Sequence, residues 1–224
     1  MKAMVLAAGR GERLRPLTDH APKPMLVVRG KPLVVWHLEA LARAGVREAV
    51  INLSWLGDSI RDAVGSGEQF GLKVQYSEES AGALEVGGGI YRALPLLGAA
   101  PFIVVNGDTF TDLDFARLEI GPTALAHLVL VPNPEHHPRG DFVLRGREIS
   151  ASEAPRLTYA GIGVYRPELF AHCAPGRFPL LPLLQAAIAA RRLTGERYDG
   201  AWTDVGSVRR LAALNEMPHD DAKA

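Results

Sequence analysis

A short stretch near the N-terminus combines small residues with positive charge. It runs from residue 6 to residue 25, reads LAAGRGERLRPLTDHAPKPM, and includes Gly9, Gly11, Arg13 and Lys23. Glycine lets a backbone amide come close to a ligand because no Cβ atom intervenes, and successive amide donors form a concave anion site. Arginine and lysine add charge-assisted hydrogen bonds. The stretch therefore indicates a phosphate site, and a triphosphate would use several of its donors.

This pattern differs from the two common phosphate loops. The chain has no GKS or GKT after these glycines, which argues against a P-loop, and Leu14 stands where G-x-G-x-x-G requires its third glycine. A basic, solvated turn that needs glycine only for its backbone is the alternative interpretation.

Two acidic residues follow partly apolar stretches. Asp108 ends the stretch PFIVVNGD, and Asp204 lies within WTDVGS. Magnesium prefers carboxylate oxygens together with substrate phosphates and water. Two such acids in a chain with a phosphate loop therefore predict a shared Mg²⁺ ion. Each acid has a simpler interpretation as a cap or turn residue.

The elements that must position these residues alternate between strand and helix in the first half of the chain. Continuously apolar runs predict strands, and apolar residues at helical spacing predict helices. We expect strands over 4–7, 47–53, 72–77 and 101–108, and helices over 32–45, 55–65 and 87–97, the last shortened by Pro95. This order predicts a parallel sheet covered on both faces, with ligands beyond the carboxyl ends of its strands.

The second half changes character. Strands are expected over 124–132 and 157–167, a hairpin around Arg145 and Gly146, and helices over 178–192 and 207–216. Trp202 is expected to pack in the core, and the adjacent His136 and His137 are expected in a surface turn. We expect one domain over residues 1–217 and a frayed tail over 218–224.

Composition narrows the classes of partner. The 224 residues are 47% hydrophobic, and 25 Lys plus Arg balance 25 Asp plus Glu. Balanced charge gives no reason to expect nucleic acid or an acidic membrane as a partner. No apolar run approaches the ~20 residues that cross a bilayer, and the N-terminal apolar run is short for a signal peptide, so we expect a cytoplasmic protein. A single cysteine, Cys173, excludes an intrachain disulfide and a cysteine-based metal cluster.

Three motifs together resemble the signature of the sugar-1-phosphate nucleotidyltransferases. They are LAAGRGERLRPLT with PKPM, VNGD, and WTDVGS, and the resemblance extends from residue 1 to about residue 210. It implies a Rossmann-like, three-layer α/β/α (GT-A-like) fold with a mixed, mostly parallel central sheet. It also implies that a nucleoside triphosphate and a sugar-1-phosphate react to give a nucleotide sugar and pyrophosphate, with Mg²⁺ as cofactor.

The resemblance also implies a role for individual positions. The residues implied to bind the nucleotide are Leu6, Ala8, Gly9, Gly11, Glu12, Arg13, Lys23, Gly87 and Gly88. Those implied to lie near the sugar phosphate are Asn106, Asp141, Glu153 and Gly161. Asp108 and Asp204 would hold the metal ion, and Arg13, Lys23 and Asp108 would be catalytic. Because the attacking phosphate oxygen is already anionic, catalysis should depend on positioning and charge neutralisation.

Within this family the chain resembles the compact bacterial uridylyltransferases that act on N-acetylmuramic acid α-1-phosphate. The segments LEVGGGI, HHPRGDF and YAGIGV carry this resemblance, which favours UTP as the nucleotide. Ala83 and Val86 depart from the base-binding segment of many relatives. Small pyrophosphorylases for glucose, mannose, heptose or phosphocholine substrates are the alternatives within enzymes. A nucleotide-binding module without catalysis is the alternative outside them.

Overall fold

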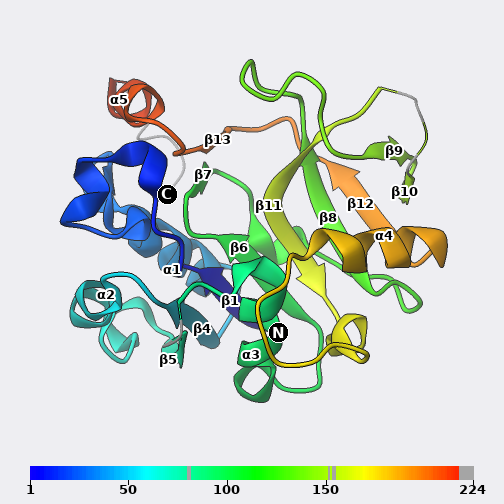
Figure 1. Ribbon diagram of the computed structural model, residues 1–224, viewed down its shortest axis with the longest axis horizontal. Coiled ribbons are helices and arrows are strands. Elements are labelled where there is room, and N and C mark those ends of the chain that lie inside the picture. Colours follow the sequence, from blue (N-terminus) through cyan, green and yellow to red (C-terminus); the bar gives the residue numbers. More distant parts are fainter. Residues whose placement is uncertain (80–81, 151, 153–154, 217–224) are drawn as a thin grey trace.

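The computed structural model describes residues 1–79, 82–150, 152 and 155–216 (Figure 1). Within these ranges, nine strands form one mixed sheet in the spatial order β5-β4-β1-β6-β11-β8-β12-β10-β9. The bounds of its strands are β1 (Lys2–Leu6), β4 (Glu48–Leu53), β5 (Lys73–Glu78), β6 (Phe102–Asn106), β8 (Ala126–Val131), β9 (Val143–Arg145), β10 (Glu148–Ser150), β11 (Thr158–Tyr165) and β12 (Leu193–Arg197). Neighbours are parallel from β5 to β6, and β11 then runs antiparallel to both β6 and β8.

Helices cover both faces of this sheet. Their bounds are α1 (Leu33–Arg43), α2 (Gly57–Val64), α3 (Glu85–Leu97), α4 (Leu181–Ala189) and α5 (Val208–Glu216). Ala3 and Val5 belong to one buried cluster with residues of α1 and α2, whereas Met4 belongs to a second cluster with residues of α3 and α4. Because successive side chains of a strand point to opposite faces, the sheet lies between two helical layers. The predicted three-layer fold with a mixed sheet is confirmed.

The parallel register aligns the carboxyl ends of three strands in one row. Leu6 of β1 is paired with Asn52 at one side and with Asn106 at the other. All three residues stand near the carboxyl ends of their strands, where ligands bind in open α/β sheets. This row is therefore the floor on which a site can be built.

Two small ribbons and several short helices complete the described fold. The ribbons pair β7 (Thr109–Thr111) with β13 (Trp202–Asp204), and β2 (Val27–Val28) with β3 (Lys31–Pro32). The 3₁₀ helices are η1 (Glu12–Leu14), η2 (Leu17–Asp19), η3 (Lys23–Met25), η4 (Glu68–Phe70), η5 (Phe115–Arg117) and η6 (Pro167–Phe170). As predicted, Trp202 is partly buried against the core, and its indole N–H donates to the carbonyl of Ala160 at 2.9 Å.

Two secondary-structure predictions were wrong. The helix predicted over 178–192 covers only Leu181–Ala189, and the chain then forms β12, a strand that lies parallel to β8. The polar, glycine-containing sequence of β12 has no strand pattern and only a weak preference for the strand conformation. Its pairing with β8 outweighs this weak local preference. Pro95 does not shorten α3, which continues to Leu97. Pro95 is exposed in the last turn, where it removes a single backbone hydrogen bond.

None of the helices in the described ranges is long and apolar enough to cross a membrane. The predicted frayed tail, residues 218–224, lies outside the described residues.

Candidate active site

The loop after β1 is held in shape by its own hydrogen bonds. Gly11 has a φ of +65°, and a Cβ atom there would lie 2.8 Å from the methyl group of Thr18. The carbonyl of Gly11 accepts hydrogen bonds from the Leu14 amide at 2.8 Å and from the Thr18 hydroxyl at 2.9 Å. Leu14 is buried, whereas Arg13 is exposed. The loop therefore buries one side chain as an anchor and leaves its basic side chain available.

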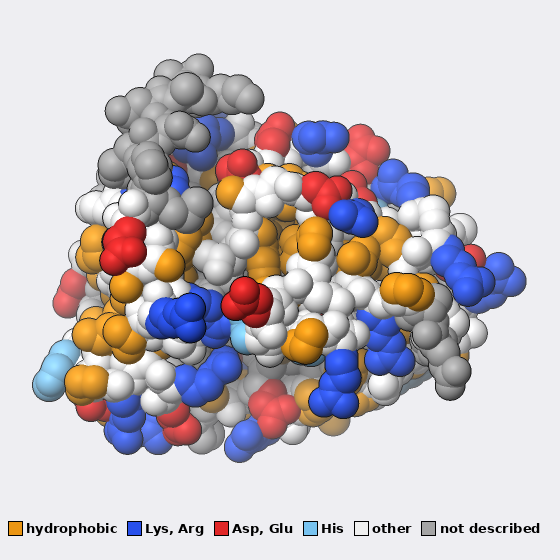
Figure 2. Space-filling model, turned by 90° about the horizontal axis from the view of Figure 1, so that it is seen from above, with side chains coloured by type: hydrophobic (Ala, Val, Ile, Leu, Met, Phe, Trp, Pro, Cys, Tyr) orange, Lys and Arg blue, Asp and Glu red, His pale blue; other side chains and the backbone are white. Residues whose placement is uncertain are grey.

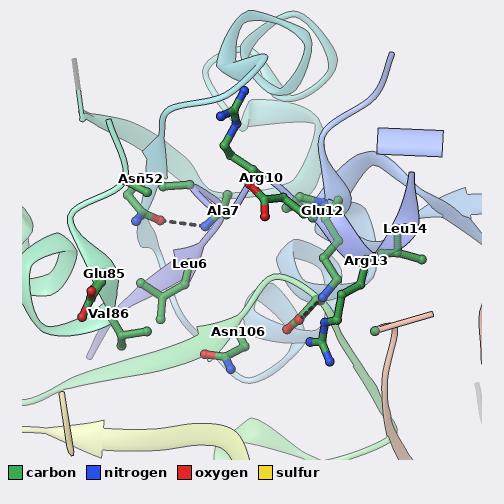
Figure 3. Close-up of a pocket in the computed structure, with 18 of the residues that line it drawn as sticks. Leu6, Ala7, Arg10, Glu12, Arg13, Leu14, Asn52, Glu85, Val86 and Asn106 are labelled. Carbon is green, nitrogen blue, oxygen red and sulfur yellow. Dashed lines mark hydrogen bonds and ion pairs between the residues drawn. The ribbon is translucent and has the colours of Figure 1, made fainter. Parts of the chain in front are cut away.

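This loop forms one wall of a cavity of about 520 Å³. Figure 3 shows Arg13 on one side of the cavity and Glu85 and Val86 on the opposite side, with Leu6 and Asn106 between them. The predicted site residues that line it are Leu6, Ala8, Gly9, Gly11, Glu12, Arg13, Lys23, Asn106 and Asp108. Figure 2 views this end of the molecule and shows hydrophobic side chains in its central hollow, with Lys and Arg side chains around it.

Arg10 is directed differently from Arg13. Its guanidinium lies 4.7 Å from the centre of the Trp55 ring, in a cation–π contact. Figure 3 shows the Arg10 side chain extending away from Asn106. Of the two arginines nearest the glycines, Arg13 is thus the one whose charge is not engaged by an aromatic ring.

Lys23 and Asp108 form an ion pair at the cavity wall. The Lys23 side chain is 12% exposed and that of Asp108 is 28% exposed. Lys23 belongs to η3, and Asp108 follows β6 after one residue, Gly107, so the two side chains reach the same place from separate elements. The pair keeps a cation and a carboxylate together in a partly buried site, where electrostatic interactions are stronger than in bulk water.

The backbone of Asp204 lies next to the backbone of Asp108, although 96 positions separate the two residues in the sequence. Asp204 is opposite Thr109 in the β7–β13 ribbon, and the Val205 amide donates to the Asp108 carbonyl at 2.7 Å. Within the described residues, the Asp204 carboxylate contacts the side chains of Arg210 and His136. Nη1 of Arg210 and Nε2 of His136 each lie 3.0 Å from Oδ1. The ribbon thus brings together the backbones of the two acids that were predicted to share a metal ion. Asp108 lines the first cavity and Asp204 does not, although Gly206, two residues later, does.

The donor set fits a metal ion that also takes ligands from a substrate. No group of three or more His, Cys, Asp or Glu side chains suited to a metal occurs in the part of the chain that the structure describes. Magnesium commonly takes one or two carboxylates from the protein and its other ligands from phosphates and water. Asp108 and Asp204 beside a basic loop match that chemistry, whereas a metal cage built of protein ligands alone does not.

A second cavity of about 500 Å³ adjoins the first, and Glu85, Val86 and Asn106 line both. Asp141 lines this second cavity and is held at both oxygens. Oδ2 accepts from the Tyr159 amide at 2.8 Å, and Oδ1 lies 2.9 Å from Nε2 of His137. The remaining wall is mostly apolar and consists of Phe142, Tyr159, Pro179, Leu180, Leu181 and Leu184.

The adjacent histidines sit in a turn, as predicted, but each ring contacts a carboxylate. His136 contacts Asp204, next to the first cavity, and His137 contacts Asp141 in the second. Both side chains are about two-fifths exposed, at 42% and 41%. The turn therefore links the two cavities, which its sequence did not indicate.

Gly161 leaves room for the side chain of Asn106. Its φ is +73°, and a Cβ atom there would lie 2.5 Å from Nδ2 of Asn106. The register of β11 against β8 shifts between Tyr159 and Gly163, so Gly161 lies in an irregular part of the strand. Glu153, the other residue predicted near the sugar phosphate, lies outside the described residues.

Gly87 and Gly88 line neither cavity. A Cβ atom on Gly87 would lie 2.6 Å from the Phe178 ring, and one on Gly88 would lie 2.3 Å from the Gly176 carbonyl oxygen. The two glycines thus allow the segment before α4 to pack closely on the first turn of α3. Their predicted contact with the nucleotide base stays a prediction.

Two buried polar residues of the site, Asn52 and Glu79, were not predicted from the sequence, and each is 3% exposed. The Ala7 amide donates to Oδ1 of Asn52, whose Nδ2 donates to Oε1 of Glu79, each at 2.7 Å. Oε2 of Glu79 accepts from the Leu84 amide at 2.7 Å. This chain of hydrogen bonds ties the phosphate-loop wall to the opposite wall of the cavity. The sequence offered a signal for Asn52, a polar residue near the end of the apolar strand β4, but none for Glu79, which follows the largely polar strand β5.

A buried histidine lies beneath Asp108. Burial lowers the pKa of His37 to about 4, although the Asp108 carboxylate and the Thr109 backbone act in the opposite direction. His37 is therefore neutral near pH 7, and it adds no positive charge to the site.

Comparisons with known proteins agree with this geometry. Residues 2–139 match the nucleotidyl transferase family. The chain is 50% identical over 220 residues to N-acetylmuramate alpha-1-phosphate uridylyltransferase of Neisseria meningitidis serogroup B, covering 94% of this chain and 95% of that one. It is 36% identical over 229 residues to the protein of the same name from Caulobacter vibrioides, covering 94% of each.

A solved structure shares the fold. It comes from Bacillus anthracis, is described as a glucose-1-phosphate thymidylyltransferase in complex with a sucrose, and superposes with a TM-score of 0.83. The match covers 100% of this chain and 97% of the other at 22% identity. With the family match over more than half of its length, the chain belongs to the nucleotidyl transferase family.

Proposed function

We propose that the chain joins UTP and N-acetylmuramic acid α-1-phosphate to form UDP-N-acetylmuramic acid and pyrophosphate. The observation that carries this proposal is the pair of adjoining cavities that meet at Asn106. One cavity offers glycine amides and cations, which suit a triphosphate. The other offers a fixed carboxylate and an apolar wall, which suit a substituted sugar.

The choice of sugar is supported by the second cavity and by the relatives. N-acetylmuramic acid carries two alkyl-bearing substituents, an N-acetyl group and a lactyl ether, that a plain hexose lacks. Phe142, Leu181 and Leu184 line the cavity where these groups would lie, and burying apolar area stabilises binding by about 25 cal/mol per Å². Relatives that are 50% and 36% identical over nearly the whole chain carry the name of this activity.

The proposed reaction is a substitution at the α-phosphorus of UTP. An oxygen of the sugar phosphate forms a new P–O bond, and the bond from the α-phosphorus to the oxygen bridging to the β-phosphate breaks. Pyrophosphate leaves with that electron pair. The sugar phosphate is already anionic and needs no strong base, so the barrier comes from repulsion between anions and from charge on the leaving group.

The chain supplies groups that lower this barrier. The amides of Gly9 and Gly11 with the Arg13 guanidinium would bind the β- and γ-phosphates, where charge grows during the reaction. Lys23, held by Asp108, would neutralise the α-phosphate and the incoming sugar phosphate. Asn106 and Asp141 would orient the sugar phosphate for in-line attack.

Asp108 and Asp204 would hold a divalent cation, Mg²⁺ in this proposal. When bound, such an ion neutralises phosphate charge next to the reacting phosphorus. We further propose that the reaction takes place in the cytoplasm, where nucleoside triphosphates are made.

A substrate panel tests the proposal. UTP, dTTP, GTP and CTP are each combined with the 1-phosphates of N-acetylmuramic acid, N-acetylglucosamine, glucose and mannose, and pyrophosphate release is measured with Mg²⁺ and with EDTA. We expect UTP with N-acetylmuramic acid α-1-phosphate to give the highest kcat/KM, by at least about tenfold, and EDTA to abolish turnover. A higher kcat/KM for another pair would show that the substrate assignment is wrong. Activity in the presence of EDTA would show that the reaction does not need a divalent cation.

A further inference from the structure

The Asp204 carboxylate is held at one oxygen by two side chains from distant parts of the chain. Nη1 of Arg210 and Nε2 of His136 each lie 3.0 Å from Oδ1. In the described residues, no hydrogen bond or ion pair involves Oδ2 of Asp204. Two donors on one oxygen restrict the rotation of the carboxylate and leave its other oxygen to take a further ligand.

The position of Gly206 shows where Oδ2 points. A Cβ atom on Gly206 would lie 2.7 Å from Oδ2 of Asp204 and 2.0 Å from Nη2 of Arg210. Gly206 itself lines the first cavity. Oδ2 of Asp204 therefore lies close to Gly206 at the edge of the first cavity, although Asp204 itself does not line that cavity. Arg210 has room at this place because residue 206 has no side chain.

The Arg210 guanidinium is itself firmly placed. Its side chain is 20% exposed, and its Nε is buried with no hydrogen-bond partner in the described part of the chain. A buried donor without a partner is unfavourable, because it has lost its hydrogen bonds to water. The contact with Asp204 is thus kept despite a local penalty, which favours a role beyond surface charge pairing.

Arg210 is presented by a packed element. It lies on α5, whose Leu214 is buried in one cluster with Leu14 of the phosphate loop and Val205 beside Asp204. The same cluster therefore fixes the loop, the acid and the helix that holds the acid.

We propose that Arg210 and His136 are positioning residues that hold Oδ1 of Asp204 so that Oδ2 is presented to a divalent cation in the first cavity. This inference rests on the metal site of the proposed function. Partners that orient a ligating carboxylate commonly change metal affinity 10–100-fold when they are removed. The opposing possibility is that Arg210 occupies the place of the cation and competes with it.

Binding of Mn²⁺ to the purified full chain separates these possibilities. Mn²⁺ is titrated in the absence of nucleotide, and the free ion is measured from its electron paramagnetic resonance signal. The variants are Arg210→Met, His136→Ala and Asp204→Asn. Arg209→Met is the matched control, because Arg209 precedes Arg210 on α5 and is exposed. Circular dichroism and Tm show whether each variant is folded.

We expect Arg210→Met to raise the Mn²⁺ dissociation constant about tenfold or more. His136→Ala should raise it about twofold to fivefold, because His136 is two-fifths exposed and its contact is partly screened. Arg209→Met should leave it unchanged, and UTP binding in EDTA should change less than about twofold in Arg210→Met. An unchanged or smaller dissociation constant in Arg210→Met would overturn the inference.

The Asp204→Asn variant distinguishes this failure from failure of the metal site. If Asp204→Asn binds Mn²⁺ as well as the unaltered protein does, the metal assignment in the proposed function is wrong. If Asp204→Asn loses Mn²⁺ while Arg210→Met keeps it, the metal site stands and only the positioning role is wrong.

Discussion

The two cavities meet at Asn106, yet their walls differ in kind. The first is built from one short loop and the ends of neighbouring parallel strands, and it presents backbone amides, Arg13 and Lys23. The second is built from a turn, a strand and α4, and it presents apolar side chains and Asp141. Backbone amides suit any triphosphate, whereas side chains can change without moving the backbone. We infer that the first cavity determines whether a nucleotide is bound and activated, and that the second determines which sugar reacts.

Removal of the Lys23 ammonium group from the first cavity should have the largest effect on activity. A small effect would contradict the role assigned to the first cavity. Lys23→Ala is expected to lower kcat/KM by about 10²–10³, the cost of losing one charged donor at a developing charge. Pyrophosphate release with saturating UTP measures it. Lys73→Ala, an exposed lysine on the edge strand β5, is the control. Turnover that is unchanged in Lys23→Ala would contradict the proposed mechanism.

Gly161→Ala probes the point where the cavities meet. The new Cβ would displace the Asn106 amide, so kcat/KM should fall by about tenfold or more for both substrates. Gly146→Ala is a matched control, because Gly146 has a similar φ of +61° with no atom within 4 Å of the new Cβ. Both variants should lose about 1–2 kcal/mol of unfolding free energy from the left-handed conformation. Equal activity in the two variants would show that Asn106 has no part in catalysis.

Leu181→Asn tests the role of the apolar wall of the second cavity. Leu181 lines that cavity and is 49% exposed, so about 1 kcal/mol of apolar contact with the sugar is at stake. The KM for the sugar phosphate should rise about fivefold, while the KM for UTP should change less than twofold. Val27→Asn, an exposed apolar residue outside both cavities, is the control. Equal changes in both KM values would show that the cavities do not act separately.

The smallest expected effect is on stability against pH. Burial lowers the pKa of His37 and of His127 to about 4, and Arg147 adds to the effect at His127. The unfolded chain binds protons at these histidines below about pH 6.5 and the folded chain does not, so stability should fall as the pH drops from 6.5 towards 4. Unfolding by urea across that range measures it.

His127→Gln separates this effect from acid effects at carboxylates. His127 is fully buried and lines neither cavity, so its replacement should reduce the loss of stability between pH 6.5 and pH 4. An identical pH dependence in the variant would exclude His127 as a source.

The same two regions differ in how far sequence predicts them. The phosphate loop was predicted because its glycines and cations lie within twenty residues, and Asp108 because it ends an apolar strand. The contact of His136 with Asp204 was not predicted, because it depends on the tertiary fold bringing together residues far apart in the sequence. The contacts of His137 with Asp141 and of Arg210 with Asp204 are local in sequence, but they depend on the conformation of loops that the sequence did not specify. The sequence around His136 reads as a turn, which is correct, and it carries no mark of Asp204.

The second cavity was predicted only in part. Asp141 was named from a resemblance, but the apolar wall from α4 was not, since a helix of leucines reads as core wherever it packs. The strand β12 was missed for the same kind of reason, because its partner β8 lies more than sixty residues earlier. Local patterns specify backbone shape, while side-chain surroundings depend on chain topology.

The packing of Leu14 against Leu214 has a consequence for synthesis of the protein. The phosphate loop is made about two hundred residues before the helix that completes its anchor. A nascent chain that ends before Val208 would therefore have most of its sheet and still lack a fixed loop. Competence to bind a triphosphate should therefore arise late in translation, after the sheet has folded.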